Sequence, residues 1–255
     1  MSGCGTIVVK LGGSAITDKS GKYAIKTEVL EEIAEAIADY ISRGGRIAIV
    51  HGGGSFGHYE VESIHAEKGL LETQDSARVQ LAMLKLAVRV LDLLVGKGVP
   101  AILHPPHSLC VNGKASQCRY SIVVKDFDLH LVPVMYGDAI PTEDGVKVLS
   151  GDDIAAALAS ILKSDCLVYV IDEKGILDKE GKIISEIKNI KEVPFRDTTS
   201  SDVTGGLRHK LEVALNLAAS FRGKIVITDV SGFKKILSGT PPEKVGSIIR
   251  GRGED

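Results

Sequence analysis

Three glycine-rich segments of the sequence each carry a residue that can hold or receive phosphate. They are residues 10–14 (Lys-Leu-Gly-Gly-Ser), 51–58 (His-Gly-Gly-Gly-Ser-Phe-Gly-His) and 202–206 (Asp-Val-Thr-Gly-Gly), the last followed by Lys210. Glycines let backbone N–H groups close on an anion without interference from Cβ, and histidine is a donor that titrates near neutral pH. Together they indicate a protein that binds a phosphorylated compound and moves phosphate.

The lysines of the first and third segments support this interpretation. Lys10 ends a strand before a tight turn, beside the N–H groups of Gly12, Gly13 and Ser14, and Lys19 can supply a second positive charge to the same loop. Gly206 lies at the start of a helix, whose positive end favours an anion, and Lys210 projects from the same face one turn later. Each segment alone also fits an ordinary turn or amphipathic helix.

Residues 52–57 also satisfy the Gly-x-Gly-x-x-Gly fingerprint of dinucleotide-binding proteins. The pattern follows a strand, but the acidic residue expected about 20 positions later is met only loosely by Glu72 or Asp75. A nicotinamide-cofactor protein is therefore the weaker alternative. The sequence contains no Walker A motif, which excludes an ordinary P-loop kinase.

Composition describes an ordinary globular protein. The 255 residues are 44% hydrophobic and 25% charged, enough for one large α/β domain or two small ones. A net charge of −2 provides no general attraction to nucleic acid or anionic lipid, so any positive site must be local. We see no signal peptide and no apolar run of bilayer length, and we expect a cytoplasmic protein.

Four cysteines are scattered through the chain without a Cys-x-x-Cys pair or neighbouring histidines at metal-ligand spacing. They are Cys4, Cys110, Cys118 and Cys166. This spacing favours free thiols in a reducing cytosol over disulfides or a metal site.

Hydrophobic periodicity predicts alternating strands and helices. The expected strands are 6–11, 46–50, 100–104, 131–135, 166–171 and 224–228, with 246–249 as a last edge strand. The expected helices are 27–42, 75–97, 151–163 and 206–220. Asp144-Gly145 and Glu180-Gly181 are typical of hairpin turns. In the second helix one face carries Leu81, Leu84, Val88, Leu91 and Val95.

This order predicts an α/β fold in which one mostly parallel sheet lies between helical layers. We expect a single domain over residues 1–255, because no low-complexity linker interrupts it. Within it, an N-terminal lobe of about residues 1–150 would bind the acceptor and a C-terminal lobe of about residues 151–255 would bind the nucleotide.

The order of the motifs resembles that of the amino acid kinase superfamily. Besides the three glycine-rich segments, the resemblance rests on Tyr136-Gly137-Asp138 and on Ser150-Gly151-Asp152-Asp153, and it spans the chain from Lys10 to about Lys210. Within the superfamily, a glycine segment that closes with a histidine, here His58, is similar to that of the archaeal-type isopentenyl phosphate kinases.

The resemblance implies an αβα sandwich with an open, mostly parallel sheet of about eight strands, usually as a homodimer. It implies ATP-dependent phosphorylation of isopentenyl phosphate to isopentenyl diphosphate in an alternative mevalonate route. The ATP phosphates would be bound by Lys10, Gly12, Gly13, Ser14, Gly54, Gly206 and Lys210. The acceptor phosphate would be held by Gly53, Gly54, His58 and Gly151, and Lys19 would stabilise the phosphoryl group in transfer.

Two positions depart from the superfamily's usual residues. The nucleotide segment 171–175 keeps Asp172 and Gly175 but has Lys174 in place of an acid. Tyr59 follows His58 where a proline is common.

Phosphoryl transfer depends mainly on positioning and charge neutralisation, which lysines, glycine N–H groups and a histidine supply. The acceptor phosphate is already ionised at neutral pH, so no general base is needed. Mg²⁺ would bridge the ATP oxygens and remain largely water-bound, without dedicated protein ligands. Asp152 either orients Lys10 or the metal shell, or is a helix N-terminal carboxylate favoured by the dipole.

Other functions remain as alternatives. Another superfamily kinase, acting on acetylglutamate, aspartate, carbamate or fosfomycin, is the first, and a non-catalytic nucleotide-sensing protein is the second. For an alkenyl acceptor, Ile64, Met83 and Leu84 could line an apolar slot, although plain helix core is the better interpretation of these three residues.

Overall fold

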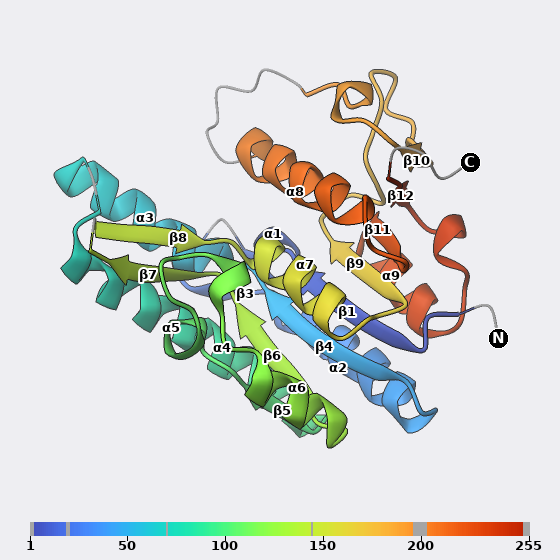
Figure 1. Cartoon of the computed structure of the whole chain (residues 1–255), viewed down its shortest axis with the longest axis horizontal. Coiled ribbons are helices and arrows are strands. Elements are labelled where there is room, and N and C mark those ends of the chain that lie inside the picture. Colours follow the sequence, from blue (N-terminus) through green and yellow to red (C-terminus); the bar gives the residue numbers. More distant parts are fainter. Residues whose placement is uncertain (1–2, 19–20, 70, 144, 196–202, 252–255) are drawn as a thin grey trace.

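The structure, a computed structural model, describes residues 3–18, 21–69, 71–143, 145–195 and 203–251. An eight-stranded sheet runs through these residues. The strand order is β10-β12-β11-β9-β1-β4-β6-β5 (Figure 1). These strands are β1 (Thr6–Leu11), β4 (Arg46–His51), β5 (Ala101–Leu103), β6 (Val132–Tyr136), β9 (Cys166–Val170), β10 (Glu186–Ile187), β11 (Lys224–Thr228) and β12 (Ser247–Ile249). The α/β class predicted from the sequence and the strand number implied by the family resemblance are confirmed.

Six of the eight strands run parallel, from β5 across the sheet to β11. β12 pairs antiparallel with β11, and β10 pairs parallel with β12 on its far side. The prediction that residues 246–249 form the edge was therefore wrong. The two-residue strand β10, which is too short to give a periodic signal, lies outside it.

Helices cover both faces of the sheet (Figure 1). On one face lie α2 (Thr27–Ser42), α4 (Ser76–Gly96) and α9 (Val230–Leu237), and on the other α6 (Ser121–Asp128), α7 (Gly151–Ile161) and α8 (Val203–Ala218). Shorter or flanking elements are α1 (Gly13–Ile16), α3 (Gly54–Lys68), α5 (Pro106–Leu109) and the 3₁₀ turns Thr73–Asp75, Ala115–Gln117, Ile190–Glu192 and Pro242–Lys244. Among the described residues, no helix combines the length and the apolar character needed to cross a bilayer.

Strand alternation decides which face each side chain of β1 joins. Ile7 and Val9 pack in the core beneath α2 and α4, whereas Val8 packs in the core beneath α7. Successive side chains of a strand point to opposite faces, so Lys10 shares the face of Val8. This alternation directs the lysine of the first glycine-rich segment towards α7 and α8.

Two small antiparallel pairs stand apart from the main sheet. β2 (Thr17–Asp18) pairs with β3 (Ala24–Ile25), and β7 (Asp138–Thr142) pairs with β8 (Gly145–Leu149). The second pair confirms the hairpin predicted at Asp144-Gly145, although Asp144 itself lies outside the described residues. Around Glu180-Gly181 the hairpin is reduced to a single bridge between Leu177 and Ile183.

Helix α4 is apolar on two faces, and the face identified from the sequence is mostly the exposed one. Leu81, Leu84, Val88 and Val95 are 54%, 40%, 44% and 54% exposed. A different set packs inside the protein: Val79, Ala82, Met83, Leu86, Ala87, Val90 and Leu94. Periodicity alone could not rank the two faces, because both repeat at helical spacing.

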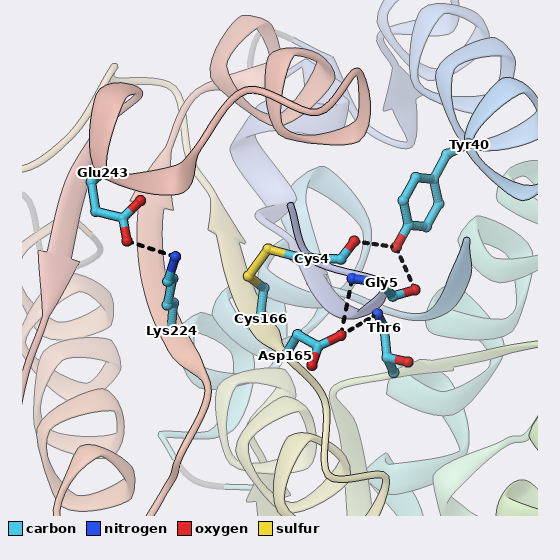
Figure 2. Close-up of a disulfide and its surroundings, with 8 residues drawn as sticks. All are labelled: Cys4, Gly5, Thr6, Tyr40, Asp165, Cys166, Lys224 and Glu243. Atoms are coloured by element: carbon cyan, nitrogen blue, oxygen red, sulfur yellow. Dashed lines mark hydrogen bonds and ion pairs between the residues drawn. A yellow bond between two sulfur atoms is a disulfide. The ribbon is translucent and has the colours of Figure 1, made fainter. Parts of the chain in front are cut away.

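Two disulfides replace the free thiols expected from the sequence, and that expectation was wrong. Cys4 bonds to Cys166 with Cα atoms 5.7 Å apart (Figure 2), and Cys110 bonds to Cys118 with Cα atoms 3.9 Å apart. The first pair is separated by 162 positions and meets because β1 and β9 are neighbouring strands. Sequence spacing carries no information on such a tertiary contact.

The segment before β1 is held at further points around this disulfide (Figure 2). The Tyr40 hydroxyl donates to the carbonyls of Cys4 and Gly5, both at 2.8 Å. One Asp165 oxygen accepts the N–H groups of Gly5 and Thr6 at 2.9 and 2.7 Å. These contacts fix the amino end of the central strand, opposite the glycine-rich loops.

Replacing Cys4 and Cys166 by alanine should lower the free energy of unfolding by about 2–5 kcal/mol, because the cross-link closes a long loop in the unfolded chain. Urea unfolding of C4A/C166A against the wild type measures this loss. The matched control is C110A/C118A, whose bond spans only 8 positions and should contribute less. A wild-type protein whose stability is unaffected by a thiol reductant would contradict the prediction.

Candidate active site

The glycine-rich loops meet at the carboxyl edge of the parallel strands. β9, β1, β4 and β6 are successive neighbours in the sheet, so the loops that follow them are adjacent. Gly12 N–H donates to the Val170 carbonyl at 2.8 Å, which ties the loop after β1 to the end of β9. In open parallel sheets ligands bind outside this edge.

The loop after β1 approaches the loop after β4 closely, and at Gly13 and Gly54 their backbones are in direct contact. A Cβ on Gly13 would lie 2.3 Å from the Gly54 nitrogen, and a Cβ on Gly54 would lie 2.0 Å from Thr17 Oγ1. Gly54 also has φ +47°, in the left-handed region that favours glycine. These two glycines are therefore required for the first and second segments to come together.

Two helices begin close to this contact. α3 begins at Gly54, and α7 begins at Gly151 after an N-cap in which Ser150 Oγ accepts Asp152 N–H at 3.1 Å. Gly137 N–H donates to the His51 carbonyl at 3.2 Å, and a Cβ on Gly151 would lie 3.3 Å from the same oxygen. The positive ends of α3 and α7 thus converge where an anion would bind.

A buried carboxylate joins the two lysines predicted to bind phosphate. Lys10 Nζ lies 3.0 Å from Asp152 Oδ1, and Lys210 Nζ lies 2.8 Å from the same oxygen. Lys10, Asp152 and Lys210 are only 9%, 5% and 5% exposed. The Lys210 ammonium also lies 4.9 Å from the centre of the Tyr169 ring. The structure thus brings the first and third segments together around a residue whose role the sequence left open.

The electrostatics of this cluster favour an incoming anion. Burial opposes ionisation of Asp152, but Lys10 and Lys210 outweigh it and hold the pKa of that carboxyl below its usual range. Burial and the nearby Lys10 lower the pKa of Lys210 to about 8. Two ammonium groups and one carboxylate leave a net positive charge, and phosphate oxygens would relieve the repulsion between the lysines.

His51 and His58 occupy different environments. His51 is fully buried, stacks on Tyr136 at 5.3 Å and has its Nδ1 3.1 Å from the Gly52 carbonyl. Burial lowers the pKa of His51 to about 4, so its ring is neutral near pH 7. His58 is exposed on α3, four residues after Gly54 and so on the same face of the helix.

Of the remaining predicted residues, Ser14, Gly206 and Asp172 lie on or next to elements that contribute to the site, whereas Gly175 and Lys19 are exceptions. Ser14 lies in α1, and Gly206 is exposed in α8 one turn before Lys210. Asp172 is exposed just beyond β9. Gly175 is an exception, because it packs against Ser247 of β12, where a Cβ would come 2.9 Å from Ser247 Oγ. Lys19 lies outside the described residues.

Two further residues of the site gave no clear signal in the sequence. Lys26 Nζ donates to the Ser14 carbonyl at 2.7 Å and lies 3.5 Å from Asp172 Oδ1, so it bridges the first loop to the end of β9. Thr17 Oγ1 donates to the Gly13 carbonyl at 2.7 Å and accepts Ser55 N–H at 2.9 Å. The only sequence signal for Thr17 was its position, because a polar residue four positions after Gly13 can hydrogen-bond to the carbonyl of that glycine.

An apolar cluster packs against α3 and α4 beside the second glycine-rich loop. Ile64 and Met83 are buried in it with Val79, Ala87, Tyr136 and Ala139. The Met83 sulfur packs over α3, since a Cβ on Gly57 would lie 2.6 Å from it. Leu84, by contrast, is 40% exposed on the outer face of α4.

Comparison with known proteins assigns the chain to a family. A model of the amino acid kinase family matches residues 5–229. The chain belongs to the amino acid kinase family. This membership agrees with a phosphate-binding site and favours a kinase over the dinucleotide-binding alternative.

Within the amino acid kinase family, the similar proteins include several named isopentenyl phosphate kinase. That of Methanocaldococcus jannaschii is 34% identical over 81% of this chain and 85% of its own length. That of Haloferax volcanii is 32% identical over 96% of this chain and 98% of its own length. The crystal structure of a Thermoplasma acidophilum isopentenyl phosphate kinase product complex superposes with a TM-score of 0.76 at 26% identity, covering 96% of this chain and all of the other.

Raising the pH above about 8 should weaken ATP binding, because Lys210 loses the charge that attracts phosphate. Below its pKa Lys210 is protonated, and above it the dissociation constant should rise about tenfold per pH unit. Calorimetric titration with ATP and Mg²⁺ between pH 7 and 9.5 measures the change. K210M should bind ATP weakly across the whole range with a flat profile. A wild-type affinity that is constant over these pH values would exclude Lys210 as the titrating group.

Proposed function

We propose that this protein transfers the γ-phosphoryl group of ATP to isopentenyl phosphate, giving ADP and isopentenyl diphosphate. The observation that carries the proposal is the Lys10–Asp152–Lys210 cluster, placed where two helix N-termini converge on the Gly13–Gly54 contact. The similarity to isopentenyl phosphate kinases over nearly the whole chain supports the choice of acceptor. Relatives with amino acid substrates are less similar, such as an acetylglutamate kinase at 26% identity.

On the donor side, Lys10 and Lys210 would neutralise ATP phosphates. The shared Asp152 oxygen holds both ammonium groups in one place, so they need little rearrangement when the phosphates arrive. Backbone N–H groups of Gly12, Gly13 and Ser14, with Gly206 in the first turns of α8, would complete the cradle. This arrangement also favours orientation of the lysines as the role of Asp152.

On the acceptor side, the N-terminus of α3 with Gly53 and Gly54, and that of α7 with Gly151, would hold the acceptor phosphate. His58 would add a side-chain donor to this phosphate, which an amino acid acceptor would not require. The attacking phosphate oxygen is already an anion. The side chains would therefore position and neutralise charged groups, and no general base would be needed. Lys19, through its place in the sequence after β2, would neutralise the group in transfer.

A metal ion would enter this site together with ATP. Asp152 is already bound by the two lysines, and the described residues contain no group of three His, Cys, Asp or Glu that could hold an ion. Mg²⁺ held by ATP phosphates and water would supply charge neutralisation without dedicated protein ligands. From the similarity to isopentenyl phosphate kinases, we further propose that the reaction belongs to isoprenoid synthesis by an alternative mevalonate route in the cytoplasm.

ADP release with three acceptors tests the proposal directly. The protein with ATP and Mg²⁺ should turn over with isopentenyl phosphate and show only background rates with N-acetylglutamate and fosfomycin. Preferred turnover of either of these would transfer the assignment to another kinase of the family. ATP binding without turnover of any of the three would favour a nucleotide-sensing protein.

Replacing His58 by alanine should raise the KM for isopentenyl phosphate by about tenfold to a hundredfold, the range expected for losing a hydrogen bond to a charged group. The KM for ATP should change far less, because His58 serves the acceptor. Steady-state kinetics with each substrate varied in turn separate the two. His65→Ala is the matched control, since His65 lies on the same helix two turns away. Unaltered acceptor kinetics in H58A would refute the assigned role.

We also propose a homodimer formed through the exposed apolar face of α4. Leu81, Leu84, Val88 and Val95 follow the spacing of a coiled-coil seam, in which apolar residues recur alternately three and four positions apart. Exposed apolar stripes of this kind mark association surfaces. A second copy of the chain, presenting the same stripe, satisfies the symmetry of a two-fold interface.

Introducing charge on this stripe should separate the two copies. L84E/V88E is expected to elute as a monomer in size-exclusion chromatography with light scattering, because like charges would face each other across the axis. L129E, at a leucine that is 62% exposed away from the stripe, should leave the dimer intact. A wild-type protein that is monomeric at micromolar concentration would rule out the interface.

A further inference from the structure

His51, the first residue of the second glycine-rich segment, is a buried histidine outside the proposed chemistry. It ends β4, and its ring stacks on Tyr136 of the neighbouring strand β6. Its Nδ1 lies 3.1 Å from the Gly52 carbonyl, and because a carbonyl oxygen can only accept, Nδ1 carries the proton. Burial, helped by the charge of Lys10, lowers the pKa of His51 to about 4. The neutral ring is therefore a fixed donor to the first peptide group of the triple glycine.

This hydrogen bond fixes the direction of the whole peptide group between Gly52 and Gly53. A trans peptide is planar, and its C=O and N–H groups point in opposite directions. The described residues contain no cis peptide bond. Because the Gly52 carbonyl is turned towards the His51 ring, the Gly53 N–H points away from that ring.

Strand alternation shows which side of the sheet the Gly53 N–H faces. Along β4, Val50 packs in the core beneath α7, the side that Lys10 shares. His51 is the next residue, so its side chain projects to the opposite face. The Gly53 N–H is thus directed towards the side of Lys10. A Cβ on Gly52 would lie 3.5 Å from Lys10 Nζ, which places this peptide beside the lysine cluster.

Close packing requires glycine at both ends of this peptide. A Cβ on Gly52 would lie 2.8 Å from the Gly13 nitrogen, and a Cβ on Gly53 would lie 3.2 Å from Gly57 Cα. The same glycines leave the peptide free to turn over, because a half turn would carry Gly53 from φ −77° into the positive region that glycine adopts readily. Backbone sterics therefore do not select the orientation, and the hydrogen bond from His51 does.

We propose that His51 is a positioning residue that locks the Gly52–Gly53 peptide with its N–H directed to the acceptor phosphate. The Nδ1–H group holds the carbonyl at the buried end, so the N–H needs no reorganisation when the phosphate binds. A peptide turned over would instead present a carbonyl oxygen, which repels an anion. The inference rests on the proposed kinase function, in which Gly53 binds the acceptor phosphate.

Substitutions of His51 that differ in their donors test this role. The amide of asparagine can place an N–H group near the position of Nδ1, whereas leucine has no donor. H51L should raise the KM for isopentenyl phosphate by about tenfold to a hundredfold, the range expected for losing a hydrogen bond to a charged group. H51N should recover most of this loss, and the KM for ATP should stay close to the wild-type value in both variants.

Thermal melting establishes that each variant is folded. A wild-type KM for isopentenyl phosphate in folded H51L would overturn the proposal, because the donor would then be dispensable. An equal rise of this KM in H51L and H51N would also overturn it, since burial of the ring and not the Nδ1–H group would then matter.

His104→Leu provides the matched control. His104 is a second buried histidine, 6% exposed at the end of β5, and its Nε2 lies 3.2 Å from Asp126 Oδ2 of α6. H104L removes a buried imidazole outside the glycine-rich loops, so the KM for isopentenyl phosphate should remain at the wild-type value. A rise equal to that of H51L would show that general disturbance of the core is responsible, and would contradict the proposal.

NMR spectroscopy of the wild-type protein with labelled imidazole nitrogens tests the geometry without turnover and without any variant. His51 should be neutral near pH 7 with its proton on Nδ1. A proton on Nε2 would refute the inference and leave the proposed function intact, because the Gly52 carbonyl would then lack its donor. Absence of ADP release by the wild-type protein with isopentenyl phosphate would instead refute the proposed function.

Discussion

Two buried ammonium groups share a single carboxylate oxygen, and the rest of the site depends on this arrangement. Lys10 comes from β1, Asp152 from the start of α7 and Lys210 from α8, so the contact joins three elements far apart in the sequence. A lone buried lysine would tend to lose its proton, and two facing each other would repel. The carboxylate keeps both ammonium groups in place but neutralises only one of their two charges. The remaining positive charge can attract a polyphosphate.

The sheet explains how these elements reach one another. Alternation along β1 sends Lys10 to the face covered by α7 and α8, while the neighbouring residues Val9 and Leu11 fill the core on the other face. The parallel order of β9, β1, β4 and β6 brings their loops to one edge. Under the proposed function, the lysine cluster would form the donor half of the site, and the N-termini of α3 and α7 would form its acceptor half.

Much of this was predictable from the sequence where the signals are local. The strand at 6–11 has the predicted bounds because it is an apolar run between Gly5 and Gly12, and the helix at 27–42 has them because its apolar residues recur at helical spacing before Gly44 and Gly45. Helix α3 was not predicted, since its buried face includes the charged Glu60. The Cys4–Cys166 bond, the contact of Asp152 with both lysines and the outer position of β10 depend on which strands become neighbours, and single-sequence patterns do not contain that information.

The backbone contact between Gly13 and Gly54 has a consequence for how such an enzyme can diversify. Because Gly13 and Gly54 have no side chains, peptide groups in close contact set the spacing of the two loops at this point, and substitution cannot shorten it. Any Cβ at either position would wedge the loops apart. Under the proposed function, variation in what the protein phosphorylates would therefore be confined to the part of the acceptor beyond its phosphate, which side chains rather than main chain would contact.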